Sequence, residues 1–420
     1  MAEDWYEEGL AHIWLPYAQM KTMRPPLAVA GTEGTRIRLA DGRELVDGIA
    51  SWWTAAHGYN HPHIRAAVAA QLGRMPHVML GGLVHEQALR LASRLARLAP
   101  GDLSRVFFSE SGSVSVEVAM KIAVQYWINR GARGRTRFAT FRGNYHGDTF
   151  ACMSVCDPDE GMHGHFAGAL PVQLVLDLPQ TDEDERRLAA TLAAHAQELA
   201  AVIHEPLVQG AIGMRMHGAH VLARIARAAK AAGLLLICDE IFTGFGRTGT
   251  FFASEAAGIV PDIMTLSKAL TGGTLPLAAT IAREEIFAAF LDEDPSRALM
   301  HGPTYTGNAL ACAAANASLD LFEDGAWEER VRAVEAHLRA ALEPMRGLDN
   351  VADVRVRGAI GAVELREAGD REALKARFIE RGVWLRPIGK VVYTTPAFTI
   401  DEESLSRLTD AMREAAVSRR

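Results

Sequence analysis

The sequence predicts an α/β protein with a mostly parallel central β-sheet and a smaller α+β part towards the end of the chain. Helical patterns alternate with short apolar runs over about 200 residues, which is the order expected of strands joined by crossover helices. Several of these runs are almost continuously apolar, as is typical of strands that helices cover on both faces. Together the two observations favour one large sheet domain.

The chain begins with a helical pattern that short strands follow. Residues 36–39 and 44–47 flank Asp41-Gly42, a dipeptide that favours a tight hairpin turn. Helices are expected next at 61–75, 85–98 and 114–129. The strands expected in the large sheet span 105–108, 137–141, 172–176, 200–204, 234–238 and 263–266.

From residue 306 onward the pattern changes to two long helices, strands near Val354, Val363 and Val391, and a last helix from Glu402. This order is typical of a small α+β lobe, which the N-terminal hairpin is expected to join. We therefore divide the chain into three parts. These are an N-terminal segment of the small domain (1–55), a large ligand-binding domain (56–305) and a C-terminal small domain (306–420).

The composition argues against several classes of protein. The chain has 420 residues, 49% of them hydrophobic, and its 44 basic and 51 acidic residues give a net charge of −7. Bulk charge therefore disfavours binding to nucleic acid or to an anionic membrane. The apolar runs are too short to span a bilayer, and the first eight residues lack the pattern of a secretory signal. The four cysteines have no metal-binding spacing, so we expect buried thiols in the cytoplasm and no metal site.

Candidate reactive residues follow two of the predicted strands. Asp239 comes directly after the run 234–238 and precedes a glycine-rich stretch at 243–249, while Lys268 follows the run 263–266. Taken singly, these residues are more often a turn carboxylate and a surface lysine. However, ligands of open parallel sheets bind at the carboxyl ends of the strands. The shared position therefore favours a desolvated, nucleophilic amine close to an acid.

A third group, Ser109-Glu110-Ser111-Gly112-Ser113, lies between a predicted strand and a predicted helix. Hydroxyls and backbone N–H groups at the start of a helix suit a phosphate, although serine there is also an ordinary helix cap. A phosphate site, an amine and a carboxylate at one edge of a sheet suggest a ligand with a phosphate, an aldehyde and a ring nitrogen. Pyridoxal 5′-phosphate has all three.

Two segments carry a family resemblance. The run DEIFTGFGRTG at 239–249, with SKALTGG at 267–273, resembles the signature of the class III aminotransferases, which are fold-type I pyridoxal-phosphate enzymes. The resemblance extends over essentially the whole chain. Within that class, further motifs resemble the adenosylmethionine–8-amino-7-oxononanoate aminotransferases, the 7,8-diaminononanoate synthases of biotin biosynthesis. These motifs lie at 13–17, 51–53, 57–62, 271–274, 301–305 and 384–387.

The resemblance implies roles for residues around the cofactor. Lys268 matches the lysine that bonds to the cofactor aldehyde and later moves a proton. Asp239 is expected to face the ring nitrogen, and Tyr145 to lie near the ring with its hydroxyl close to the substrate. Gly112 and Ser113 are expected to hold the phosphate.

The same resemblance implies an obligate homodimer with sites at the subunit interface. By analogy with the family, Pro303 and Thr304 reach the phosphate in the partner subunit's site, and Gly302 lies at the substrate. The substrates it implies are S-adenosylmethionine, the amino donor, and 8-amino-7-oxononanoate, the acceptor.

For the acceptor, Arg386 is expected to bind the carboxylate through its planar guanidinium group. Tyr17, Trp52 and Trp53 are expected to line an apolar channel. We expect Trp52 to be the tryptophan at the site, although core packing is the more common role of such a pair. An aromatic wall also suits the sulfonium and adenine groups of the donor.

Some interpretations stay open at this point. Arg247 is either a carboxylate contact or part of a structural ion pair, and Glu205 is expected to support the site from behind. Other activities within the class are an ω-amino acid:pyruvate transamination, or lysine as the donor. A non-catalytic regulator that binds pyridoxal phosphate is disfavoured, because no DNA-binding module is evident in the sequence.

Overall fold

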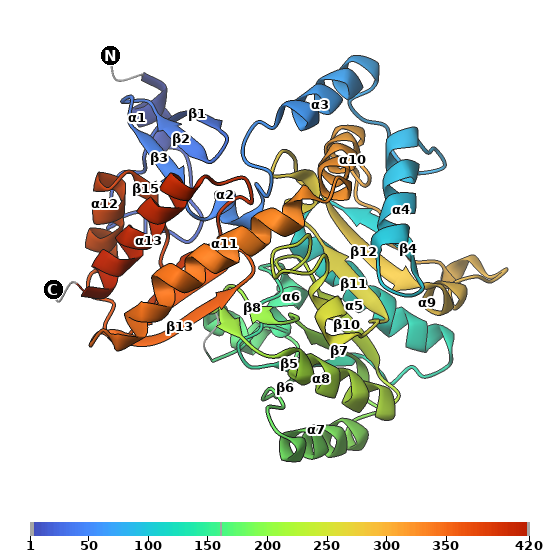
Figure 1. Cartoon of the computed structure of the whole chain (residues 1–420). Coiled ribbons are helices and arrows are strands. Elements are labelled where there is room, and N and C mark those ends of the chain that lie inside the picture. Colours follow the sequence, from blue (N-terminus) through green and yellow to red (C-terminus); the bar gives the residue numbers. More distant parts are fainter. Residues whose placement is uncertain (1–3, 160–161, 418–420) are drawn as a thin grey trace.

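A seven-stranded sheet forms the centre of the molecule (Figure 1). The computed structural model describes residues 4–159 and 162–417; the first three residues, on which the expectation of no secretory signal partly rests, lie outside that description. The strand order is β4-β12-β11-β10-β7-β5-β6. The strands are β4 (Leu103–Ser109), β5 (Arg137–Phe141), β6 (Leu174–Leu176), β7 (Leu199–His204), β10 (Leu235–Asp239), β11 (Ile263–Leu266) and β12 (Ala278–Arg283).

The prediction of a mostly parallel sheet is confirmed, with one addition. β10 pairs in parallel with β7 and β11, and β5 with β6 and β7, whereas β12 runs antiparallel to both β4 and β11. The sequence analysis missed β12. Its sequence, AATIAR, is rich in alanine, a residue that favours helices and is depleted in strands.

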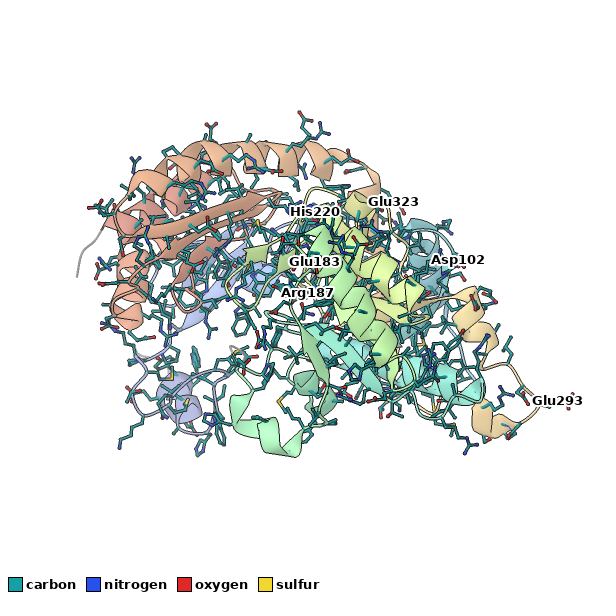
Figure 2. The ribbon with its side chains drawn as sticks, turned by 90° about the horizontal axis from the view of Figure 1, so that it is seen from below. Asp102, Glu183, Arg187, His220, Glu293 and Glu323 are labelled. Atoms are coloured by element: carbon teal, nitrogen blue, oxygen red, sulfur yellow. The ribbon has the colours of Figure 1, made fainter. Side chains whose placement is uncertain are left out.

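Helices cover both faces of this sheet, which explains why its central strands β7 and β10 are almost continuously apolar and buried. Ile203 and Ile237 pack with α5, whereas their chain neighbours Val202 and Leu236 pack with α8 on the opposite face. The helices of this domain are α3 (Pro62–Arg74), α4 (Glu86–Leu98), α5 (Gly112–Asn129), α7 (Asp182–Ala194), α8 (Ala219–Ala231) and α10 (Ala309–Glu323). Glu183 and Arg187, which lie on α7 and have exposed side chains, are labelled in Figure 2.

The second lobe combines both ends of the chain, as predicted. The N-terminal hairpin, β2 (Arg36–Leu39) and β3 (Glu44–Asp47), joins a small sheet in which β3 pairs in parallel with β15 (Val383–Trp384). Beside it lies an antiparallel sheet of β13 (Val351–Arg357), β14 (Ile360–Leu365) and β16 (Val391–Thr394). The helices of this lobe are α11 (Ala326–Leu342), α12 (Arg371–Glu380) and α13 (Glu402–Val417).

The remaining elements are short. In the part of the chain that the structure describes they are α1 (Asp4–Leu10), β1 (Val29–Glu33), α2 (Ala50–Trp53), α6 (Phe150–Ser154), β8 (Val208–Gln209), β9 (Arg215–Met216), α9 (Glu284–Ala288) and five 3₁₀ helices. The domain boundaries at 55 and 305 stay a prediction, and α10, which follows residue 305, packs against α3 and α4 of the large domain. No helix within residues 4–159 and 162–417 is long and apolar enough to cross a membrane.

Backbone hydrogen bonds of Gly48 link the end of strand β3 to the C-terminal lobe. Its N–H donates to the Trp384 carbonyl at 3.0 Å, and its carbonyl accepts from the backbone N–H of Thr395 at 2.7 Å. A Cβ at this position would lie 2.5 Å from Leu385 Cδ2 and 2.7 Å from Leu408 Cδ2. A side chain at this junction would therefore have to displace both leucines.

We predict that Gly48→Ala lowers the free energy of unfolding by about 1–3 kcal/mol, because the added methyl group overpacks the junction. Denaturant unfolding followed by circular dichroism measures the change. Gly73→Ala is the matched control, since Gly73 lies in α3 with open space around its Cα, and it should be neutral or slightly stabilising. Equal unfolding midpoints for the two variants would contradict the prediction.

Candidate active site

A cavity of about 160 Å³ lies where the parallel strands of the large sheet end. Asp239 is the last residue of β10, Lys268 follows β11, and α5 begins just after β4. Tyr145 and Glu205 follow β5 and β7 in the same way. The cavity is lined by Trp53, Ser111, Gly112, Ser113, Tyr145, His146, Gly147, Glu205, Ala211, Asp239, Ile241, Phe242, Ser267 and Lys268. The strand topology therefore brings together residues that are up to 215 positions apart in the sequence, from Trp53 to Lys268.

The Lys268 amine lies beside a pair of packed aromatic rings. Its Nζ is 4.3 Å from the centroid of the Trp53 ring and 5.7 Å from that of Phe242. Burial lowers the pKa of Lys268 to about 8, although the charges of Asp239 and Glu205 act in the opposite direction. The backbone at Lys268 has a φ of 46°, a left-handed conformation that is strained for a residue with a side chain. With a pKa of about 8, roughly a tenth of the Lys268 amines are neutral at pH 7, far more than for an ordinary lysine.

Asp239 is held by three donors. One carboxylate oxygen lies 2.7 Å from His146 Nδ1, and the other accepts from the Ile241 N–H and the Thr265 hydroxyl, both at 3.1 Å. A carboxylate offers about four lone-pair sites, so one remains for a donor in the cavity. His146 was not assigned a role from the sequence, although it lies in the motif around Tyr145.

The start of α5 forms the third part of the cavity. The Ser111 side chain caps the helix by accepting from the Val114 N–H, which leaves the first-turn N–H groups of Gly112 and Ser113 without partners inside the helix. Gly147, with a φ of 128°, lies against this turn, and a Cβ there would be 2.1 Å from Ser113 Oγ. Because the two segments approach each other closely, the site beside the free N–H groups is small. The N–H groups and the helix dipole make it suited to an anion.

An outer group of polar side chains lies around Tyr145. Its hydroxyl donates to Asp148 Oδ1 at 2.9 Å, and Tyr17 also donates to Asp148 while its hydroxyl lies 3.3 Å from that of Tyr145. His163 Nε2 lies 2.9 Å from the same Asp148 oxygen. Burial raises the pKa of Asp148, but hydrogen bonds from Tyr17, His163 and Tyr145 outweigh it and leave the pKa below its usual value. Asp148 was missed in the sequence, because an acid after a glycine gives no distinctive signal.

The two neighbouring tryptophans occupy different places. Trp53 lines the cavity beside Lys268, whereas Trp52 is 38% exposed and lies in the outer group, with its ring 6.1 Å from that of Tyr17. The Arg386 guanidinium lies 4.5 Å from the centroid of the Trp52 ring. Burial lowers the pKa of Arg386. Arg386, Trp52 and Tyr17 thus lie together in the outer group, next to the cavity that contains Lys268.

Both tryptophans belong to a left-handed turn, α2. The φ angles of Ala50, Ser51, Trp52 and Trp53 are 45°, 50°, 57° and 72°. For residues with a side chain, this conformation costs about 1–2 kcal/mol each. Four such residues in succession require strong compensation from their surroundings.

Comparison with known proteins gives a consistent result. The class-III aminotransferase family matches residues 17–416. A protein of Mycobacterium leprae named adenosylmethionine-8-amino-7-oxononanoate aminotransferase is 44% identical over 415 residues, which are 97% of this chain and 95% of the relative. The chain belongs to the class-III aminotransferase family.

Solved structures agree with the family assignment. An adenosylmethionine-8-amino-7-oxononanoate aminotransferase from Methanocaldococcus jannaschii has a TM-score of 0.92 at 34% identity, with 98% of each chain covered. A PLP-bound amine transaminase from an uncultivated Pseudomonas species has a TM-score of 0.90 at 32% identity, with 96% of this chain and 98% of that chain covered. The predicted fold-type I architecture is thereby confirmed.

The cavity of this class-III aminotransferase fits pyridoxal phosphate. Asp239 has acceptor capacity left for a ring nitrogen, Lys268 presents an amine, and the start of α5 offers N–H groups to a phosphate. His146 Nε2 is buried without a hydrogen-bond partner, as is compatible with a polar ligand at this position. A Cβ at Gly112 would come within 3.0 Å of the Ile241 side chain, so this wall of the cavity has no room for a larger residue.

Glu205, which lines the cavity, and Arg247, which does not, differ in their contacts. Glu205 accepts from the backbone N–H groups of Tyr145 at 2.8 Å and Gly210 at 3.1 Å, and burial raises its pKa to about 8. Arg247 is buried and donates to the carbonyls of Ala359 and Pro396. Within the described part of the chain no carboxylate pairs with Arg247, so its contacts to two backbone carbonyls fit neither the substrate contact nor the ion pair considered above.

Gly302, Pro303 and Thr304 do not line the cavity of their own chain. They lie in the segment before α10, where His77 Nε2 is 3.1 Å from the Thr304 carbonyl. Their predicted role in the partner's site therefore stays a prediction.

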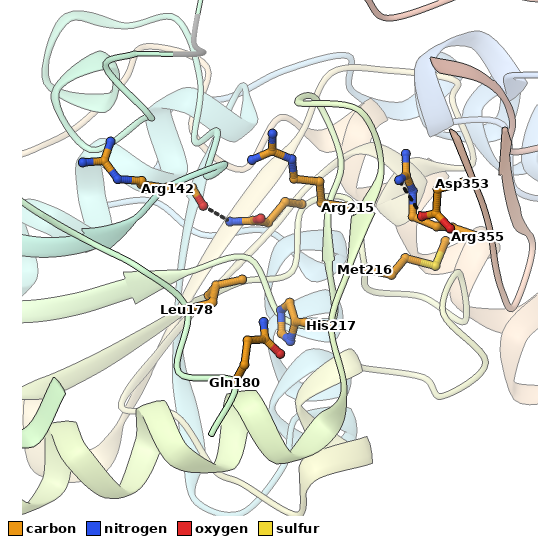
Figure 3. Close-up of a pocket in the computed structure, with 9 residues that line it drawn as sticks. Arg142, Leu178, Gln180, Arg215, Met216, His217, Asp353 and Arg355 are labelled. Carbon is orange, nitrogen blue, oxygen red and sulfur yellow. Dashed lines mark hydrogen bonds and ion pairs between the residues drawn. The ribbon is translucent and has the colours of Figure 1, made fainter. Parts of the chain in front are cut away.

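A second cavity, of about 370 Å³, lies between β9 and β13 and is a poorer candidate (Figure 3). Arg142 pairs with Asp159 and Asp177, and Arg355 pairs with Asp353 and Glu364, so these charges are already neutralised. The residues that line it include no lysine and no hydroxyl group: Arg142, Leu178, Gln180, Gln209, Arg215, Met216, His217, Asp353 and Arg355. Catalysis by a nucleophile is thus better placed at Lys268.

We predict that pyridoxal phosphate attaches covalently to the cofactor-free enzyme at a rate that rises with pH and levels off above about 8. Only the neutral amine attacks an aldehyde, and it predominates above the Lys268 pKa. Stopped-flow absorbance measures the rate. In Glu205→Gln the midpoint of this pH dependence should move to lower pH, because the charge of Glu205 raises the pKa of Lys268. A midpoint near the ordinary lysine value would contradict the prediction.

Proposed function

We propose that this class-III aminotransferase transfers the amino group of S-adenosylmethionine to 8-amino-7-oxononanoate, with pyridoxal 5′-phosphate as cofactor. The product is 7,8-diaminononanoate, so the reaction is a step of biotin biosynthesis. The observation that carries this proposal is the arrangement of Arg386, Trp52 and Tyr17 at the approach to Lys268. It lies in a chain whose near full-length relatives bear the name of this activity.

The cofactor, when bound, supplies a ring that withdraws electrons from the carbon next to the substrate nitrogen. Lys268 would hold the cofactor through its aldehyde, and its Nζ would be the base that takes up and returns a proton beside the substrate. Asp239 would face the ring nitrogen and favour its protonated form, while His146 and Thr265 fix the carboxylate. Gly112 and Ser113 would hold the phosphate at the start of α5.

The acceptor is a long chain with a carboxylate at one end and an amino-ketone at the other. In this proposal Arg386 binds the carboxylate through a two-pronged hydrogen bond. Trp52 and Tyr17 cover the methylene groups, and Trp53 borders the reacting end beside Lys268. Arg386 is not among the residues that line the cavity with Lys268, so the carboxylate and the reacting end of the acceptor would be bound at different places.

The donor carries a sulfonium cation and an adenine ring. Aromatic faces at Tyr17 and Trp52 attract both groups, and the ionised Asp148 adds a negative charge next to Tyr17 and Tyr145. The hydroxyl of Tyr145, which donates to Asp148, lies where it can orient the substrate near the ring. A lysine donor is also a cation, so these residues alone do not separate the two donors.

The proposal includes a homodimer in the cytoplasm. Two segments carry exposed apolar or aromatic side chains: Met79, Val84, Met300 and Tyr305. The segments meet where the His77 and Tyr305 rings contact each other in a tilted arrangement, with centroids 4.6 Å apart. Such a surface suits a second copy of the chain, which would bring Gly302, Pro303 and Thr304 to the partner's cavity. The four cysteines are buried and free, as expected in a reducing compartment.

A second candidate is an amine or ω-amino acid transamination, which the likeness to the Pseudomonas amine transaminase supports. A donor panel decides between the two. With 8-amino-7-oxononanoate as acceptor, we expect diamine product with S-adenosylmethionine and little with lysine, alanine or β-alanine. Lys268→Ala should give no product and lack the absorbance band of lysine-bound cofactor. Product with lysine alone, or with none of the donors, would overturn the assignment.

We predict that Arg386→Ala raises KM for 8-amino-7-oxononanoate about 10- to 100-fold, because charge-assisted hydrogen bonds to the carboxylate are lost. Cofactor content should stay at the wild-type level. Arg381→Ala is the matched control, since Arg381 lies in the same lobe and pairs with Glu414 on the surface. If both variants keep the wild-type KM, Arg386 does not bind the acceptor.

A further inference from the structure

The strained turn that carries Trp52 and Trp53 is tied to one buried carboxylate. Asp47, the last residue of β3, is 2% exposed. Its Oδ1 accepts from the Ile49 N–H at 2.9 Å, and its Oδ2 accepts from the Ser51 N–H at 2.7 Å. The Tyr59 hydroxyl donates to the same Oδ2 at 2.6 Å.

These hydrogen bonds act on the backbone that has to stay left-handed. Ser51 has φ 50° and ψ 57°, and its N–H points back to a residue four positions earlier in the chain. Burial raises the pKa of Asp47, while the hydrogen bonds from Tyr59 and from the backbone of Ile49 and Ser51 act in the opposite direction and favour the ionised form. In that form the carboxylate gives stronger hydrogen bonds than a neutral acceptor, and because it is buried no water competes for its donors. The carboxylate therefore opposes the tendency of this turn to relax into an ordinary conformation.

The tryptophan side chains of the turn contact the residues proposed to react with and bind the substrate. The Trp53 ring packs on Phe242 at 4.4 Å between centroids and faces Lys268 Nζ, while Trp52 faces the Arg386 guanidinium. Asp47 is also paired with Trp384 in β15, two residues before Arg386. A single residue thus joins the backbone of the turn to the strand that leads to the arginine.

We propose that Asp47 and Tyr59 are positioning residues for the substrate pocket, and that they hold the left-handed turn which places Trp52 and Trp53. Neither side chain touches the cavity, so the effect passes through the backbone of 49–53. This inference rests on the proposed function for the identity of the substrate, but the geometry of the turn does not depend on that identity.

The test uses the cofactor-loaded enzyme and two readouts. Binding of nonanoate, a nine-carbon carboxylate without an amino or keto group, is measured by titration calorimetry, and KM and kcat are measured with 8-amino-7-oxononanoate. Asp47→Asn keeps one acceptor and loses the charge. It should weaken nonanoate binding and raise KM about 10-fold, with kcat changed less than about threefold. Tyr59→Phe should act in the same direction by a smaller factor.

A second substitution separates positioning from general damage. In the Asp47→Asn background, Ser51→Gly should restore most of the nonanoate affinity, because glycine adopts the left-handed conformation without strain. Ser51→Ala should not restore it. Asp370→Asn, which removes the charge of a helix-capping aspartate at α12, is the matched control and should bind nonanoate like the wild type.

The outcomes are distinct. Wild-type nonanoate affinity in both Asp47→Asn and Tyr59→Phe would overturn the proposal, as would equal behaviour of glycine and alanine at position 51. If Asp47→Asn does not fold, Tyr59→Phe with and without the position 51 changes decides the question by the same criteria. Failure of the wild-type enzyme to aminate 8-amino-7-oxononanoate would refute the proposed function instead, because the nonanoate measurement requires no transamination.

Discussion

The competition between burial and charge at the Lys268 amine governs the site. Trp53 and Phe242 shield the amine and favour its neutral form, while two acids nearby favour the ammonium. Burial prevails, because the pKa falls from 10.5 to about 8 despite both acids. Glu205 contributes less opposing charge than its position suggests, since burial raises its own pKa to about 8. Asp239 has three hydrogen-bond donors around it, and these already stabilise part of its negative charge.

The substrate pocket depends on contacts between distant parts of the chain. The turn with Trp52 and Trp53 follows β3, and Arg386 follows β15, which pairs with β3 in parallel. The reactive lysine belongs to the large sheet, and Arg247 links the loop after β10 to carbonyls in the second lobe. The two lobes therefore meet at the pocket, and neither lobe contains a complete site.

Much of the fold and of the inner cavity follows from the sequence, for identifiable reasons. Apolar runs bounded by glycine or charge marked β10 and β11, and strand-end geometry then predicted that Asp239 and Lys268 share a cavity. β12 was missed, because an alanine-rich strand gains its stability from its neighbours rather than from its own residues. Asp148 and His146 were missed, since hydrogen bonds between side chains far apart in sequence leave no local pattern. The different placement of Trp52 and Trp53 depends on a left-handed turn. This turn contains no glycine, so the sequence does not predict its left-handed conformation.

The antiparallel strand β12 has a consequence for the size of the ligand. It lies between β4, which α5 follows, and β11, which Lys268 follows. Neighbouring strands lie about 4.8 Å apart, so β4 and β11 are about 10 Å apart across the sheet. β10, which ends at Asp239, is the next strand beyond β11. The strand order therefore sets the spacing of the three chain segments that border the cavity, and with it the size of a ligand that can contact all three.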